Sequence, residues 1–220
     1  PAFTAINTGT SPVIATITVT PTFENGGVSC TGPATPFEIT VNPTAQVNPT
    51  VDMVVTDGDD IDIPFSTINT GGTSTYTWTN TDPTTGLTNT GSSDIGFTAV
   101  NTGTSPITTT VVVTPTFENG GNSNSGPTDT FIITVNPTAQ IDPIDSLVFC
   151  DEDVINPIVF TTQNTGGTTT YTWTNDNTSI GLAASGSGTI SAFTALNSSN
   201  QTQVANIVVI PTFESGGVSN

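Results

Sequence analysis

The sequence predicts an all-β fold made of domains that recur along the chain. Short runs alternate polar and apolar side chains, as strands with one buried face do. Turn residues separate these runs at intervals of about 8–15 residues, and no run has the periodicity of a helix. The same series of motifs then returns about every 95 residues, which marks a tandem repeat.

The expected strands follow one another in the order of the repeat. The clearest alternating runs are Thr16–Phe23, Phe37–Val41, Ile61–Phe65 and Thr75–Thr79. The expected turns between them are rich in Gly, Asn, Asp and Ser and lie at 25–27, 57–60, 69–72 and 90–92. Threonine suits the exposed strand faces, because its β-branched side chain fits a pleated surface.

Three motifs define the repeat. The segment 3–12 returns at 97–106 and more loosely from Phe193, the segment 21–27 returns at 115–121 and 211–217, and the segment 76–80 returns at 171–175. A period near 95 residues is about the size of one immunoglobulin-like sandwich. We therefore expect tandem immunoglobulin-like β-sandwich domains arranged as beads on a string. Such faithful copying favours a mechanical or multivalent module over an enzyme.

The domain boundaries are expected at two copies of one Pro-bearing motif. Asn42–Gln46 and Asn136–Gln140 each follow a strong strand run, and their prolines cannot join a ladder. Short Pro-bearing linkers are semi-rigid. This frame makes 1–44 the C-terminal part of one domain, 45–138 a complete domain, and 139–220 a domain that lacks its last strand.

The charge excludes several classes of function. The chain has 18 acidic residues and no Lys, Arg or His, for a net charge of −18. Binding to nucleic acid or to anionic lipid needs basic side chains, so both are excluded. Without His or Lys most general-base and Schiff-base chemistry is absent, and we expect no enzyme. No apolar run has the roughly 18–20 residues of a membrane helix, so we expect no membrane insertion.

The acidic turns are the candidate metal sites. Asp57, Asp59 and Asp62 align with Asp151, Asp153 and Asn156 one period later. Oxygen ligands on alternate residues of a tight loop suit Ca²⁺, which takes six to eight of them. The alternative is a solvated β-turn, in which Asp caps local backbone groups. Glu24, Glu118 and Glu214 recur at the Gly-Gly hairpin, either as a ligand from a second loop or as solvated hairpin residues.

The aromatic and cysteine residues have less specific interpretations. Tyr76 and Trp78, with their copies Tyr171 and Trp173, form either a platform for sugars or the core of a sandwich, and we favour the core. Cys30 and Cys150 occupy non-equivalent positions of the repeat, so we expect no bridge between them. Each is a remnant of a lost framework or the partner of a cysteine outside this sequence.

The combined motifs resemble a known repeat class. Tyr-Thr-Trp-Thr-Asn, Phe-Thr-Ala-x-Asn-Thr-Gly-Thr-Ser-Pro, Val-Thr-Pro-Thr-Phe-Glu-Asn-Gly-Gly and Ile-Thr-Val-Asn-Pro-Thr are similar to the PKD-like repeats of giant surface proteins in gliding Bacteroidota, the group of the SprB-type gliding-motility adhesins. The resemblance implies export by the type IX system to the outer cell surface. It also implies adhesion during gliding motility, cysteines after the hairpin and before the acidic turn, and O-glycosylation at 129–131 and 145–147.

We therefore expect a stalk or adhesive segment of a long extracellular filament, whose weak contacts sum through multivalency. The expected partner is a substratum or surface polysaccharide, or other copies of the chain. The alternatives are a self-assembling fibre or sheath, a carbohydrate-binding accessory module, and an ice-binding surface suggested by the Thr-rich runs. Ice-binding arrays repeat at much shorter periods than about 95 residues, which disfavours the last.

Overall fold

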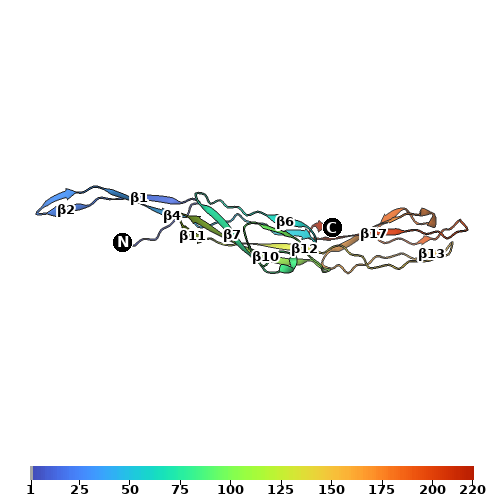
Figure 1. The fold of residues 1–220 in the computed structure, drawn as a ribbon. Coiled ribbons are helices and arrows are strands. Elements are labelled where there is room, and N and C mark those ends of the chain that lie inside the picture. The colour runs from blue at the N-terminus through green and yellow to red at the C-terminus, as the bar shows by residue number, and fades with distance from the viewer. Residues whose placement is uncertain (1) are drawn as a thin grey trace.

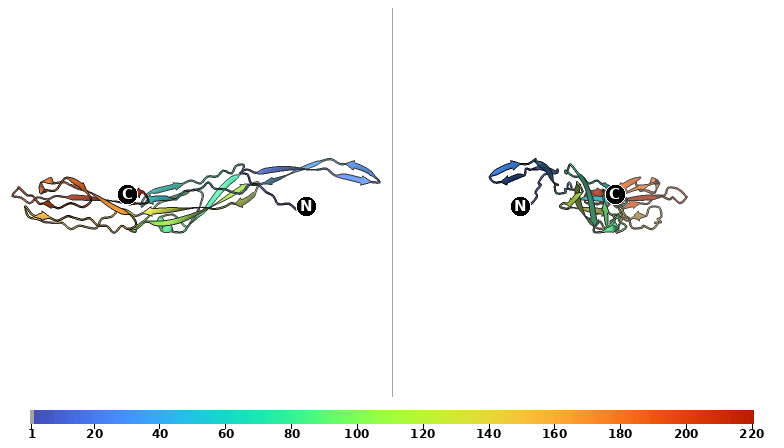
Figure 2. Two further views of the ribbon diagram at one scale, coloured as in Figure 1. Left: turned by 180° about the vertical axis from the view of Figure 1, so that it is seen from behind. Right: turned by 60° about the vertical axis from the view of Figure 1, so that its left-hand side comes forward.

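The computed structural model describes residues 2–220 and is all-β, as predicted. Its strands fall into a first segment (residues 2–44), a middle segment (45–138) and a last segment (139–220). The three segments follow one another along a line, so the molecule is long and narrow (Figure 1). The view from behind shows the same arrangement, with the C-terminus returning to the boundary between the middle and last segments (Figure 2).

The middle segment has two sheets around a closed core. The larger sheet has the order β5-β12-β10-β7-β8, with β11 also paired to β10, and the smaller sheet is β6-β9. The strands are β5 (Met53–Thr56), β6 (Asp60–Ile63), β7 (Thr73–Asn80), β8 (Thr90–Ser92), β9 (Ile95–Thr98), β10 (Ile107–Asn119), β11 (Asn122–Ser125) and β12 (Asp129–Asn136). All pairs are antiparallel except β5 with β12. The apolar side chains of alternating positions, such as Val111, Val113, Phe131 and Ile133, are fully buried between the sheets.

The last segment repeats this arrangement without counterparts of β5 and β12. Its strands are β13 (Val154–Ile155), β14 (Thr168–Asn175), β15 (Ser185–Ser187), β16 (Phe193–Thr194), β17 (Ile207–Ser215) and β18 (Val218–Ser219). Trp173 lies opposite Val209 on β17, as Trp78 lies opposite Val113 on β10. Val209 is only half-buried, because no described strand pairs with β17 where β12 pairs with β10 in the middle segment.

The first segment contains counterparts of β10, β11 and β12 only. They are β1 (Val13–Val19) with β2 (Thr22–Asn25), β3 (Val28–Thr31) and β4 (Thr35–Val41). β1 pairs with β4, and β2 pairs with β3, both antiparallel. Phe37 is half exposed here, whereas its copy Phe131 is buried in the middle segment, because no second sheet covers this ladder.

The aromatic side chains belong to the core, as the sequence favoured. Trp78 and Trp173 are each about 6 % exposed. Tyr76 lies against Phe65 with ring centroids 5.5 Å apart, and Tyr171 against Phe160 at 5.4 Å. Neither pair forms an open platform for stacking sugars.

Two local expectations differ from the structure. The run 16–23 is divided at Pro21 into β1 and β2, although its copy continues through Pro115 within β10. The expected turn at 90–92 is wrong, because these residues form the edge strand β8. Gly91 permits this pairing: a Cβ there would lie 2.1 Å from the Trp78 ring. The only helical elements among residues 2–220 are two 3-10 turns, η1 (Pro83–Thr85) and η2 (Thr178–Ile180).

Candidate functional site: the junctions between segments

The Asn-Thr-Gly-Thr-Ser loop, at residues 7–11 and 101–105, forms the end of the first and of the middle segment that faces the next segment. The Asn7 amide donates to the carbonyl oxygens of Ser11 and Val41, both at 2.8 Å, and its Oδ1 accepts from the Gly9 N–H. Asn101 makes the same bonds to Ser105, Val135 and Gly103 in the middle segment. Each Asn therefore fastens its loop to the last strand of its own segment.

The following segment binds this loop through a second recurring asparagine. The N–H of Thr70 donates to the carbonyl oxygen of Thr10 at 2.8 Å. Beside it the amide of Asn69 donates to the Thr44 carbonyl oxygen at 3.2 Å and accepts from the Gln46 N–H at 2.7 Å. Asn69 thus connects the linker to the segment that follows it.

The second junction repeats these contacts. Thr165 N donates to the Thr104 carbonyl oxygen at 2.8 Å. Asn164 donates to Thr138 O at 3.2 Å and accepts from Gln140 N at 2.7 Å. Both Asn69 and Asn164 are more than nine-tenths buried.

The Gly-Gly hairpin makes the third contact, and it points back to the preceding segment. The amide of Asn42 donates to the carbonyl oxygens of Asn119 and Asn122 at 3.0 and 3.3 Å. The amide of Asn136 donates likewise to Ser215 and Val218 at 2.9 and 3.2 Å. The glycines allow the tight turn, since Gly120 and Gly121 have φ of 63° and 75°.

The linker is packed rather than hanging free. Ala45 is fully buried, and its carbonyl oxygen passes so close to Gly126 that a Cβ there would lie 1.8 Å from it. The ring of Pro12 lies against Gly71, and the ring of Pro106 lies against Gly166 in the same way, each 2.9 Å from a virtual Cβ. The two junctions therefore share the hydrogen bonds described above and the contact between a proline ring and a glycine.

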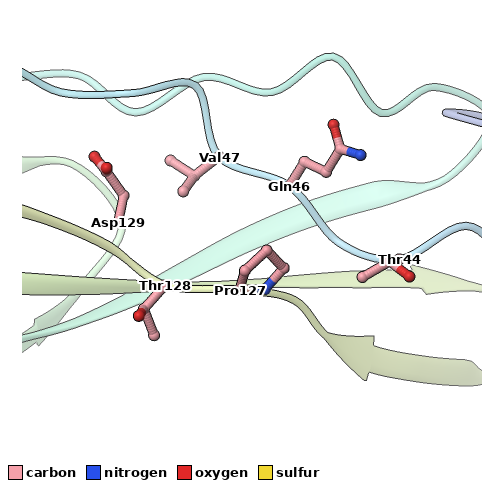
Figure 3. Close-up of a pocket in the computed structure, with 6 residues that line it drawn as sticks. All are labelled: Thr44, Gln46, Val47, Pro127, Thr128 and Asp129. Atoms are coloured by element: carbon pink, nitrogen blue, oxygen red, sulfur yellow. The ribbon is translucent and has the colours of Figure 1, made fainter.

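Two shallow hollows lie beside the first junction. One of about 290 Å³ is bounded by the linker residues Thr44, Gln46 and Val47 and by residues 127–129, which lead from β11 into the start of β12 (Figure 3). Asp129 is its acidic group, and one carboxylate oxygen accepts from both the N–H and the hydroxyl of Thr50. The second hollow, of about 610 Å³, lies between β4 and the hairpin of β10 and β11. Neither brings together a nucleophile and a base.

The acidic turn of the middle segment is bound to its surroundings through the carboxylates of two predicted ligands. Asp57 accepts from the Asn101 N–H at 2.8 Å and from the Thr138 hydroxyl at 2.9 Å, which brings this turn to the second junction. Asp59 accepts from the Thr56 N–H at 2.8 Å. Asp62 lies exposed on β6, opposite Gly96.

The copy in the last segment behaves in the same way. Asp151 accepts from the Asn197 N–H and Asp153 from the Cys150 N–H, both at 2.7 Å. Asn156 lies exposed after β13. Across residues 2–220 no three His, Cys, Asp or Glu side chains are grouped closely enough to hold a metal ion. The turn alternative therefore has a structural basis, and calcium stays a prediction.

The other singled-out residues lie at the surface. Glu118 accepts from the Gly121 N–H at 3.0 Å, which makes it part of the hairpin turn. Cys30 and Cys150 are exposed free thiols. The sequence interpretation missed the asparagines at 7, 42, 69, 101, 136 and 164, although their recurrence beside Gly, Pro or Thr in each copy is the signal that points to them.

Comparisons of the chain with known proteins assign it to no family. No protein-family model matches the chain, and no curated protein matches it. Within the described residues no helix is long and apolar enough to cross a membrane.

Proposed function

We propose that this chain is a stalk segment of a long extracellular filament, built from tandem immunoglobulin-like, PKD-like β-sandwich units. The observation that carries the proposal is the set of hydrogen bonds that the two junctions share. The loop, the linker and the hairpin are among the motifs that the sequence copies faithfully, and these three meet where one segment follows another. Copying therefore preserves the way in which each unit is attached to the next.

A repeated junction of this kind produces a stiff rod. A net hydrogen bond contributes about 1 kcal/mol, and each junction has several that involve buried amides. Because the same contacts recur, each added unit takes the same orientation to its predecessor. Such a chain gains reach with every copy, and its charge of −18 keeps neighbouring rods apart.

The adhesive part of the proposal depends on multiplicity. The outer face of the large sheet presents Thr75, Thr77 and Thr79 on β7, all exposed, and β14 presents an equivalent row in the last segment. Hydroxyl groups repeated on successive units suit weak contacts to a substratum or surface polysaccharide, which sum when many units engage. The proposed location is the outer cell surface.

Bead adhesion tests this function. Beads would carry the chain or a tandem duplicate of residues 45–138, at equal mass, over polysaccharide-coated and bare surfaces. Retention that rises steeply with unit number supports adhesion. If retention is independent of unit number while the rod remains rigid, the segment acts as a spacer and is not adhesive.

A self-assembling fibre is the second candidate, favoured by the open edge of β17, where Val208 and Ile210 are exposed. Sedimentation velocity separates the two. A filament stalk stays monomeric as concentration rises, whereas a fibre subunit forms a growing series of oligomers.

A further inference from the structure

The two cysteines occupy positions of the repeat that lie at opposite ends of one segment. Cys30 corresponds to Asn124 and Asn220, and Cys150 corresponds to Thr56. In the middle segment Asn124 lies opposite Phe117 near one end of β10. Thr56 lies opposite Asn136, just past the other end of β10. About ten residues of strand separate the two ends, or roughly 33 Å. A disulfide needs Cα atoms within about 7 Å, so no bridge forms inside a segment.

Across a junction the same two positions converge. β18 of the last segment lies against β5 of the middle segment, where a Cβ on Gly216 would lie 2.9 Å from Val54 Cγ2. Asn136, the partner of Thr56 in the ladder, donates to the Val218 carbonyl oxygen at 3.2 Å. Asn220 donates to the carbonyl oxygen of Pro137, the residue after Asn136, at 2.9 Å. The hairpin position and the position before the acidic turn therefore meet at residues 136–137.

The first junction shows the hairpin half of this arrangement independently. Asn124 donates to the Pro43 carbonyl oxygen at 3.2 Å, as Asn220 does to Pro137. In both copies that lack the hairpin cysteine, an asparagine there binds the preceding segment. Cys30 occupies the same place in the first segment, and it is exposed.

We propose that Cys30 and Cys150 are each half of a disulfide that joins successive units. Cys30 bonds to a cysteine at the Thr56 position of the preceding unit, and Cys150 to a cysteine at the hairpin position of the following one. Each thiol pair loses two protons and two electrons to an external disulfide such as oxidised glutathione, which is reduced to two thiols. The inference rests on the proposed tandem array, and it makes some junctions covalent and others hydrogen-bonded.

The test recreates the pair at the second junction. In a C30S/C150S background, T56C/N220C would be oxidised in a glutathione buffer, and the bridge mapped by non-reducing peptide mass spectrometry and thiol alkylation. The matched control is T56C/N124C, whose cysteines lie at opposite ends of one segment. We expect a bridge between residues 56 and 220 in the monomer, at least tenfold more than the control pair gives. Equal oxidation of the two pairs would overturn the inference.

Two further measurements keep the outcome interpretable. Tryptophan emission of the reduced variants checks that each folds. In the native chain, oxidation must leave Cys30 and Cys150 of one molecule unlinked to each other, and a bridge between them within a monomer would also overturn the inference. If the engineered pair fails to close while the junction remains rigid by spin-label distances, the disulfide is wrong and the proposed stalk stands. A flexible junction would contradict the proposed stalk function as well.

Discussion

Removal of the Asn136 amide should loosen the second junction and be detected in the neighbouring segment. The side chain is fully buried in β12 of the middle segment, yet its two hydrogen bonds go to Ser215 and Val218 of the last segment. In N136A both bonds are lost. At about 1 kcal/mol each the loss is about 2 kcal/mol, because the freed carbonyl oxygens lie in an exposed hairpin and regain water. That corresponds to a roughly thirty-fold weaker docking of the two segments.

The two tryptophans make this measurable. Trp78 lies in the core of the middle segment and Trp173 in that of the last, so W78F leaves fluorescence that reports only the last segment. Urea unfolding of W78F/N136A should show a lower midpoint for Trp173 than W78F alone. W78F/N200A is the matched control, because Asn200 is exposed. An unchanged Trp173 midpoint in W78F/N136A would refute the coupling of the segments.

Three further outcomes follow from the same contacts. In chemical denaturation, G126A should destabilise the first junction by about 1–3 kcal/mol, because its Cβ would lie 1.8 Å from a linker carbonyl oxygen. G96A is the control and should be nearly neutral, because a Cβ at Gly96 would have no atom within 4 Å. Equal destabilisation by the two substitutions would contradict the packed linker. The Thr84 hydroxyl bound to the Asp82 carboxylate lowers the pKa of Asp82 below 3.8, so this bond stabilises the fold above that pH and its contribution is lost as pH falls through the lower folded value. Thermal melts of wild type and D82N should therefore differ near neutral pH and converge in acid, and a difference that persists in strong acid would contradict this. Thermal melts with Ca²⁺ and with chelator test the acidic turns. If these turns bind calcium, the melting midpoint should be higher with Ca²⁺ than with chelator. An unchanged midpoint would contradict calcium binding.

The strands were predictable because their signal is local. Alternation of polar and apolar residues places Phe131, Ile133 and Val135 on one face of β12, and the structure buries all three. The recurring Trp also indicated the core. β8 was not predictable from composition, since Thr90-Gly91-Ser92 has turn chemistry, and only the ring of Trp78 above Gly91 explains its place in the sheet.

The junction was predictable only in part. The prolines of Asn42–Gln46 and Asn136–Gln140 indicated a stiff linker, but the docking depends on residues distant in the chain. Asn42 reaches Asn119, and Asn136 reaches Ser215, 77 and 79 residues away. A single asparagine has no periodicity, so its partner cannot be found from spacing alone. The sequence shows that these asparagines recur in each copy, and only the structure shows which residues they bind.

The proposed stiff rod requires a fixed distance between successive segments. Double electron–electron resonance can measure this with spin labels at Thr77 on β7 and Thr170 on β14, both exposed, in a C30S/C150S background. A docked junction predicts one narrow distance distribution that broadens in N136A. A broad distribution in the parent protein, like that of a flexible linker, would contradict the rigid stalk.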